Sequence, residues 1–445
     1  MIDVSTVSEV GRAAVPANVD RATYLSHLLS LRSPLTDAFS WLQAVRDRAA
    51  IRIPELAIPS TRDEEWRFTD LSSLLAIELQ AITSQPAAIA QSDIESFQLP
   101  EASTRLVFVD GVYVPELSAI ADLPKTVFVG DLAAATAAGL TDPMLAHLAT
   151  QPGAEETFTT LNTASFTHAA VIAVPKNQTV TTPIHLLFVS THGQGAALNH
   201  PRCLVMVESN SNVTLIEDYV ATSDSAYFTN AVTEIWLAPN AQVQHTRVQR
   251  DSLAAFHIGK TAVTQARDAR YTGNAISLGA AVARHHLEVY QTGEQTETTL
   301  NGLSYLKGHQ VADTHSLISY TQPHGTSHQV HKCIVDDRAH AIFNGKIFVP
   351  QLAQLTDARQ LSQNLLLSDK ARVDTKPQLE ITADNVKCAH GATVSQLEND
   401  EIFYLQSRGI DQAQAVKLLT YAFAYEVIAQ IPIASLRENL LQRIA

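Results

Sequence analysis

Short runs rich in Val, Ile and Thr follow one another from about residue 155 to residue 390, and this long strand-rich stretch limits the folds available to the chain. The only helix-length amphipathic pattern within it is QLAQLTDARQLSQNLLLS, residues 351–368. Tight hairpin dipeptides are rare after Asp110–Gly111, which disfavours a sandwich or barrel built from hairpins. A parallel β-solenoid is the other all-β fold that fits.

The turns between these runs resemble one another. The similar segments are SNSNVTL, APNAQVQ, ARDARYT, DDRAHAI and SDKARVD. Their central apolar residues are Val213, Val243, Tyr271, Ala341 and Val373, which fall about 28–32 residues apart or near multiples of that spacing. A repeat of this length is typical of one coil of a solenoid, so the pattern predicts a β-helix.

The two ends of the chain have helical patterns. Asp20 is positioned to cap a helix that begins at RATYLSHLLSL, and residues 105–114 form a hairpin pattern around Asp110–Gly111. After residue 396, Asp411 with Gln414 opens a helix that is apolar on two sides. We therefore predict an N-terminal helical domain (1–100), a β-helix core (101–395) and a C-terminal helical domain (396–445).

The composition excludes several classes of protein. Hydrophobic residues make up 46% of the chain, and the net charge of −14 is spread along it, which disfavours binding to nucleic acid. No stretch reaches the roughly 20 apolar residues that cross a membrane. Three distant cysteines do not make a disulfide framework, and the N-terminus lacks a secretory pattern. We expect a cytoplasmic protein without a membrane partner.

Cys388 and His390 form the first candidate site. In a strand, residues i and i+2 share a face, and sulfur with imidazole suits iron, zinc or copper(I). The neighbouring Lys387 would favour the thiolate. Two ligands do not complete a metal site, so a ligand pair, a nucleophile, a redox switch and a buried turn all remain open. Cys203 and Cys333 are expected to pack in the core.

A second candidate is a group of histidines between residues 309 and 340. The group consists of His309, His315, His324, His328, His331 and His340. Such a cluster could make the chain a self-contained metal-binding protein, with Asp313 or Asp336 completing the cage. Strands would instead scatter these side chains over several faces, and His285 and His286 would point to opposite faces.

The segment STRDEEWRFTD, residues 60–70, carries adjacent carboxylates beside Arg and Trp. Paired carboxylates can perform acid–base catalysis, but the pattern is equally typical of a structural network of salt bridges. The sequence contains no GxxxxGK[ST], GxSxG or GxGxxG motif. Nucleotide sites of the common kinds are therefore not expected.

Three stretches resemble one family. They are TRDEEWRFTDLSSL, RLVFVDGVYVPELS and PQLEITADNVKCAHGATVSQLENDEIFYLQSRGI (377–410). These stretches resemble, in the same order, the SufD branch of the SufB/SufD family of iron–sulfur cluster assembly proteins. The low cysteine count and the DEEWRFTDL segment favour SufD, and a SufB-like paralogue is the alternative. Ala389, Ser395 and Glu398 depart from the usual family pattern without removing a candidate ligand.

The resemblance implies a right-handed parallel β-helix between two helical domains. It also implies a non-enzymatic scaffold subunit that pairs with a SufB-like paralogue through the β-helix and with a SufC-like ATPase through its C-terminal helices. Homodimers occur in the family. By the same resemblance, the location is cytoplasmic, or the stroma of a plastid in a plant or alga.

The family likeness also assigns roles to the candidate residues. Cys388 and His390 would lie at the interface with the SufB-like subunit, where the partner chain supplies the remaining ligands to iron or to a transient iron–sulfur cluster. No cofactor would be bound stably by this chain alone. Tyr404, Arg408 and Gly409 would shape the contact with the SufC-like ATPase. Alternatively, Arg408 pairs with helix carbonyls and Gly409 only ends a helix.

Overall fold

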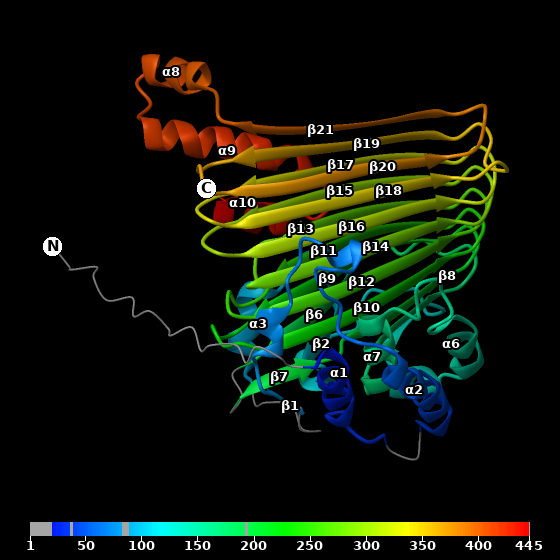
Figure 1. The fold of residues 1–445 in the computed structure, drawn as a ribbon. Coiled ribbons are helices and arrows are strands. Elements are labelled where there is room, and N and C mark those ends of the chain that lie inside the picture. Colours follow the sequence, from blue (N-terminus) through cyan, green and yellow to red (C-terminus); the bar gives the residue numbers. More distant parts are fainter. Residues whose placement is uncertain (1–19, 36–38, 82–88, 192–194, 445) are drawn as a thin grey trace.

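The core of the molecule is a parallel β-helix. The computed structural model describes residues 20–35, 39–81, 89–191 and 195–444. Two sheets face each other, and each turn of the chain adds one strand to each sheet (Figure 1). In sheet I the strand order is β21-β19-β17-β15-β13-β11-β9-β6-β2-β3, and in sheet II it is β20-β18-β16-β14-β12-β10-β8-β5-β4.

The strands of the two sheets have similar lengths in the upper turns. Sheet I contains β2 (Thr104–Val109), β3 (Val112–Tyr113), β6 (Ile184–Ser190), β9 (Asn212–Ala221), β11 (Gln242–Arg250), β13 (Arg270–Ser277), β15 (Glu297–Leu306), β17 (Thr326–Val335), β19 (Asp357–Leu366) and β21 (Lys387–Gln396). Sheet II contains β4 (Phe128–Asp131), β5 (Ala170–Val174), β8 (Arg202–Val207), β10 (Phe228–Leu237), β12 (Phe256–Gln265), β14 (Val282–Gln291), β16 (Val311–Tyr320), β18 (His340–Val349) and β20 (Arg372–Ile381). Strands β1 (Leu79–Gln80) and β7 (Ala196–Asn199) pair beside sheet II.

The spacing of the turns is confirmed as the repeat of the solenoid. Val213, Val243 and Tyr271 stand in register on successive strands of sheet I. Ala341 and Val373 are likewise in register, but in sheet II. The similar turn segments thus precede strands of both sheets, because each coil passes through two turns of this kind. This explains why the spacing between Tyr271 and Ala341 is not a whole number of coils.

The helix-length pattern at 351–368 does not form a helix. Residues Asp357–Leu366 form β19, which pairs along its whole length with β17 on one side and β21 on the other. The inward positions include Gln360, Ser362 and Asn364, all of which are buried. Because polar residues occupy the inner face here, the alternation of a strand is hidden in the sequence. Pairing with the edge of β17 makes residues 357–366 a strand in spite of their helix-like sequence pattern.

The hairpin at 105–114 is confirmed: β2 and β3 pair antiparallel, and Asp110 and Gly111 have φ of 49° and 82°, as a two-residue hairpin turn requires. β2 also pairs parallel with β6, so it belongs to the first coil of the β-helix. Helices α5 (Leu132–Ala137), α6 (Thr141–His147) and α7 (Thr157–Ser165) follow it, inside the predicted core region of 101–395. The domain boundaries therefore remain a prediction.

The N-terminal helices cover the lower coils of the β-helix (Figure 1). They are α1 (Arg21–Ser30), α2 (Ser40–Arg52), α3 (Ser72–Leu75), α4 (Gln91–Ile94), α5 (Leu132–Ala137), α6 (Thr141–His147) and α7 (Thr157–Ser165), with short 3₁₀ turns η2 (Ile53–Glu55), η3 (Glu64–Trp66), η4 (Glu95–Phe97) and η5 (Pro115–Leu117). Asp20 caps α1 by accepting the N–H of Thr23 at 2.9 Å, as predicted. Leu25 and Leu28 pack with Phe228 on the outer face of sheet II.

The C-terminal helices are α8 (Asn399–Ser407), α9 (Gln412–Ile428) and α10 (Ala434–Ile444). Asp411 caps α9 by accepting the N–H of Gln414 at 2.9 Å, as predicted. Val427 and Leu440, from α9 and α10, pack against Ile276 and its neighbours on the outer face of sheet I. Each such buried side chain stabilises the docked helices by about 1.5–3 kcal/mol. No helix in the described ranges has the length and apolar character needed to cross a membrane.

Candidate functional site

The β-helix is open at its upper end, where the last strand of each sheet has a free edge. β20 pairs only with β18, and β21 pairs only with β19, among the described strands. Two neighbouring ten-residue edges therefore present backbone N–H and C=O groups without partners. Exposed apolar side chains lie on them: Val394 is 50% exposed and Ile381 is 37% exposed. β20 also carries Lys376 and Pro377, residue types that limit indiscriminate edge pairing, whereas β21 has Lys387 alone as a charged residue. A free edge of this length is a template for another strand.

Cys388 and His390 both lie on β21, at this open end. They register with Ala358 and Gln360 of β19, both buried, so the two side chains share the face that points into the β-helix. Cys388 is partly buried and packs against the interior core, whereas His390 is exposed. The structure thus places a thiol and an imidazole side by side where the last coil has no coil above it.

The Cys388 thiol is held in its protonated form. Burial raises its pKa, and the charge of Asp357 acts in the same direction. The expectation that Lys387 favours the thiolate is wrong, because adjacent residues of a strand point to opposite faces. At neutral pH this thiol therefore loses its proton only when a metal ion binds the sulfur or a cation from another chain approaches it.

Polar groups continue below His390 inside the β-helix. The Gln360 amide donates to Gln329 at 2.8 Å, and the Gln329 amide donates to Ser316 at 2.8 Å. The carbonyl oxygen of Gln360, by contrast, is buried without a partner. An unpaired buried acceptor costs about 1–3 kcal/mol, so the upper lumen is polar and not fully satisfied.

Sequence reasoning missed a charged network deeper in the lumen. His245 lies 3.2 Å from the Glu217 carboxylate, and Arg247 donates to His257 at 2.6 Å. The His257 ring lies 2.9 Å from Asp251. All five side chains are buried. The signal that could have revealed the network is the acidic pair within the apolar run NVTLIEDYV, where an inward carboxylate demands a buried partner.

Cys203 and Cys333 are fully buried, as expected for core residues, and neither forms a disulfide. Burial raises the pKa of both thiols. Cys388 is thus the one cysteine of the chain that a partner or reagent reaches from the open end.

The helix α8 projects beyond β21 (Figure 1). None of its residues is buried, and Phe403 and Tyr404 are 70% and 58% exposed. Gly409, at φ 86°, ends the helix, and the N–H of Ile410 donates to the carbonyl of Leu405, so Gly409 has the capping role. The Arg408 guanidinium lies over the ring of Tyr404, 5.4 Å from its centroid, and not at the helix carbonyls.

The segment 60–70 lies across the outer face of sheet II and acts as a structural strap. Glu65 pairs with His315 of β16 at 3.1 Å, and Glu64 pairs with Lys376 of β20 at 3.1 Å. The strap therefore reaches from the N-terminal helices to the edge strand of the open end. Glu64 and Glu65 are engaged in ion pairs, and Asp63 accepts hydrogen bonds from Ser60, in agreement with the structural interpretation.

The histidines between 309 and 340 do not converge. His331 points into the lumen and stacks on Phe343, with ring centroids 4.6 Å apart, whereas His328 is exposed. Across the described parts of the chain, none of the six joins a group of three possible metal ligands. His285 and His286 do point to opposite faces, since His285 bonds to the buried Thr261. The site of the self-contained metal protein, as proposed from the sequence, is therefore not assembled.

The fold and the site together define a parallel β-helix protein whose last coil is unpaired and carries a thiol and an imidazole. Residues 188–423 match the family model described as "SUF system FeS cluster assembly, SufBD core domain", and residues 22–186 match "SufBD protein N-terminal region". The chain therefore belongs to the SufB/SufD family of the SUF system for iron–sulfur cluster assembly.

Individual relatives agree with this placement. The chain is 47% identical over 406 residues to a SufBD family iron–sulfur cluster assembly protein of Synechocystis sp., covering 89% of each chain. It is 34% identical over 390 residues to SufD of Escherichia coli, covering 87% of this chain and 88% of that protein. A chloroplastic protein of Arabidopsis thaliana, ABCI7, is 33% identical over 408 residues, with coverages of 89% and 84%. The resemblance to SufD inferred from the motifs is thus confirmed.

Proposed function

We propose that this chain is the SufD-type scaffold subunit of an iron–sulfur cluster assembly complex. It pairs with a SufB-like paralogue through the open end of the β-helix and binds a SufC-like ATPase through its C-terminal helices. It catalyses no reaction itself. The observation that carries the proposal is the pair of unpaired ten-residue edges, β20 and β21, with Cys388 and His390 on the latter.

The open end is suited to another β-helix of the same kind. Two parallel sheets that end together offer two edges at once, and a paralogue with the same coil dimensions could continue both. The apolar side chains Val394 and Ile381 would become buried in such a joint. A second copy of this chain fits the same edges, which makes a homodimer the expected state of the chain without its paralogue.

The nascent cluster or its iron is the cargo of the complex, and this chain supplies half of the site that holds it. His390 offers an exposed imidazole, and Cys388 offers a thiol whose proton must leave before sulfur can bind iron. Thiolate and imidazole from one chain need two more ligands, which the paralogue would provide. The cluster is then held only while the complex is assembled.

The contact with the ATPase falls on α8 and the exposed side of α9. Phe403, Tyr404, Leu418 and Tyr425 are large and exposed there, whereas the opposite side of α9 is buried on sheet I. Binding and hydrolysis of ATP on two SufC-like subunits would pull on these helices. Because α8 follows directly after β21, the movement would reach the open joint and expose Cys388 and His390 to iron and sulfide.

The test is to purify the tagged chain gently from its own host and to identify the accompanying proteins by mass spectrometry. Stoichiometric SufB-like and SufC-like subunits are expected, with the complex in the cytoplasm or, in a plant or alga, in the plastid stroma. Within that complex, Cys388→Ser and His390→Ala should lower cluster formation and leave the subunit stoichiometry unchanged. Recovery of the chain alone, with normal cluster formation in both variants, would overturn the proposal.

A further inference from the structure

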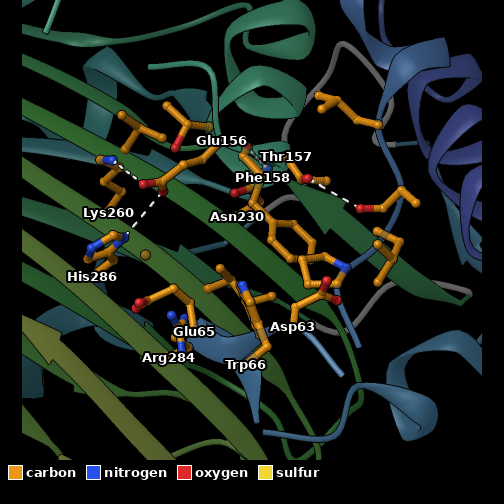
Figure 2. Close-up of a pocket in the computed structure, with 18 of the residues that line it drawn as sticks. Asp63, Glu65, Trp66, Glu156, Thr157, Phe158, Asn230, Lys260, Arg284 and His286 are labelled. Carbon is orange, nitrogen blue, oxygen red and sulfur yellow. Dashed lines mark hydrogen bonds and ion pairs between the residues drawn. The ribbon is translucent and has the colours of Figure 1, made fainter. Parts of the chain in front are cut away.

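A cavity of about 450 Å³ lies on the outer face of sheet II (Figure 2). Cys388 and His390 do not line it, because they lie on β21, the last strand of sheet I. Residues of the segment 55–66, the beginning of α7 and outward side chains of β10, β12 and β14 line it. Trp66 and Phe158 form an apolar part of the wall. Glu156, Lys260 and His286 gather at the opposite, charged part. A concave site with a few convergent polar groups is the usual form of a ligand site.

Three groups of the metal-ligating type converge beside this cavity. Ligand atoms of Glu156, His286 and Glu288 all lie within 4.8 Å of one another. The two ring nitrogens of His286 lie 3.2 Å from Glu156 and 3.2 Å from Glu288, respectively. His286 and Glu288 are two residues apart on β14 and share its outer face, whereas Glu156 comes from the residue that precedes α7. The fold therefore builds this set from two separate elements.

A cation already occupies the space between the two carboxylates. The Lys260 ammonium lies 2.7 Å from Glu288 and 3.0 Å from Glu156, and its side chain is 5% exposed. It also donates to the carbonyl of Gly153 at 3.1 Å. A Cβ on Gly153 would come within 2.2 Å of this nitrogen, so a glycine is needed to leave the space free. The arrangement is thus built around a positive charge.

The charge balance of the cavity also favours a cation. Glu65 and Glu156 line the cavity, and Glu288 lies next to Glu156 and His286. Of the two strong bases in the lining, Arg284 is paired with Asp313.

We propose that Glu156, His286 and Glu288 bind a divalent first-row transition-metal ion, with Lys260 as the competing internal cation that withdraws into the cavity when the ion binds. One imidazole and two carboxylates form the donor set that suits Fe²⁺, Mn²⁺ or Zn²⁺. The three protein ligands leave coordination positions open toward the cavity. The site is independent of the open end and of the proposed pairing with another subunit.

The experiment uses the full chain with Cys388→Ser and His390→Ala, so that the open end contributes no ligands. After removal of metal with a chelator, Co²⁺ is titrated as the probe, and its visible absorption and the heat of binding are measured. We expect one Co²⁺ per chain. His286→Gln should weaken the binding by about tenfold or more, and the exposed His328→Gln should leave it unchanged.

Lys260→Met is the variant that separates a metal site from a structural ion-pair network. It removes the competing cation and should tighten Co²⁺ binding by about tenfold or more, because the carboxylates are no longer neutralised. Its folding is checked by circular dichroism, and if it does not fold, the comparison of His286→Gln with His328→Gln decides. Absence of stoichiometric Co²⁺ binding in the parent and in Lys260→Met, or binding that His286→Gln leaves unchanged, would overturn the proposal.

Discussion

A proline at Ala392 should weaken pairing at the open end without unfolding the chain. Lys387 donates its N–H to the carbonyl of Thr356, the residue before β19, at 2.8 Å. In a parallel ladder the direction of the N–H alternates along the strand, so the N–H of Ala389 points to β19 and that of Ala392 points to the free edge. Proline at position 392 therefore removes no hydrogen bond within the chain, but it removes one donor that a partner strand would use.

Proline has different energetic effects at position 392, on the free edge of β21, and at position 389, where the N–H points to β19. One backbone hydrogen bond across the joint contributes about 0.5–1.5 kcal/mol, so its loss should raise the dissociation constant about two- to twelvefold. The proline ring adds a steric barrier to the approach of the partner strand. Ala389→Pro is the matched control, because it leaves a carbonyl of β19 unpaired inside the chain and should cost about 1–3 kcal/mol of folding free energy.

The assay combines thermal unfolding of each isolated variant with measurement of its affinity for the SufB-like subunit. Ala392→Pro should keep the unfolding temperature of the parent and bind more weakly, whereas Ala389→Pro should unfold at a lower temperature. If Ala392→Pro binds as tightly as the parent, the free edge of β21 is not the pairing surface, and the reasoning is refuted.

Three further outcomes are expected. Gly409→Ala places a side chain at φ 86° with no atom within 4 Å of its Cβ, so about 1 kcal/mol of backbone strain should speed amide exchange in α8 and weaken ATPase binding, with global unfolding unchanged. Burial alone would lower the pKa of His315, but Asp313 and Glu65 raise it. The stabilisation that protonated His315 provides is therefore complete below about pH 6.5 and is lost as the pH rises through the raised pKa. The difference in unfolding free energy between the parent and His315→Gln should shrink between about pH 6 and pH 9, and a constant difference would contradict this. Cys388 in the isolated chain should react with iodoacetamide slowly at neutral pH and faster above pH 9 or so, and equal rates at both would be contrary to its raised pKa.

The β-helix was predictable because similar turn sequences recur at the spacing of one coil. Val213, Val243 and Tyr271 fill one inward column, and similar turn segments precede each of them. The strand β19 could not be predicted from the sequence, because Gln360 and Ser362 face inward and break the alternation of apolar and polar residues. A polar lumen removes the signal on which strand assignment depends.

The candidate site was predictable only in part, for a physical reason. Cys388 and His390 are two residues apart on one strand, so local geometry alone places them on one face. Glu156 and His286, in contrast, meet only because α7 packs on the outer face of sheet II. Contacts of this kind depend on tertiary packing, which no spacing along the chain encodes.

The central claim is that the open end of the β-helix is the joint with the partner subunit. Amide hydrogen exchange, measured on the chain alone and in its complex with the SufB-like subunit, tests it most directly. The account predicts strong new protection in β20 and β21, at residues 372–381 and 387–396, with little change in the lower coils around β2 and β6. Unchanged exchange in β20 and β21, with protection appearing at the lower coils instead, would contradict it.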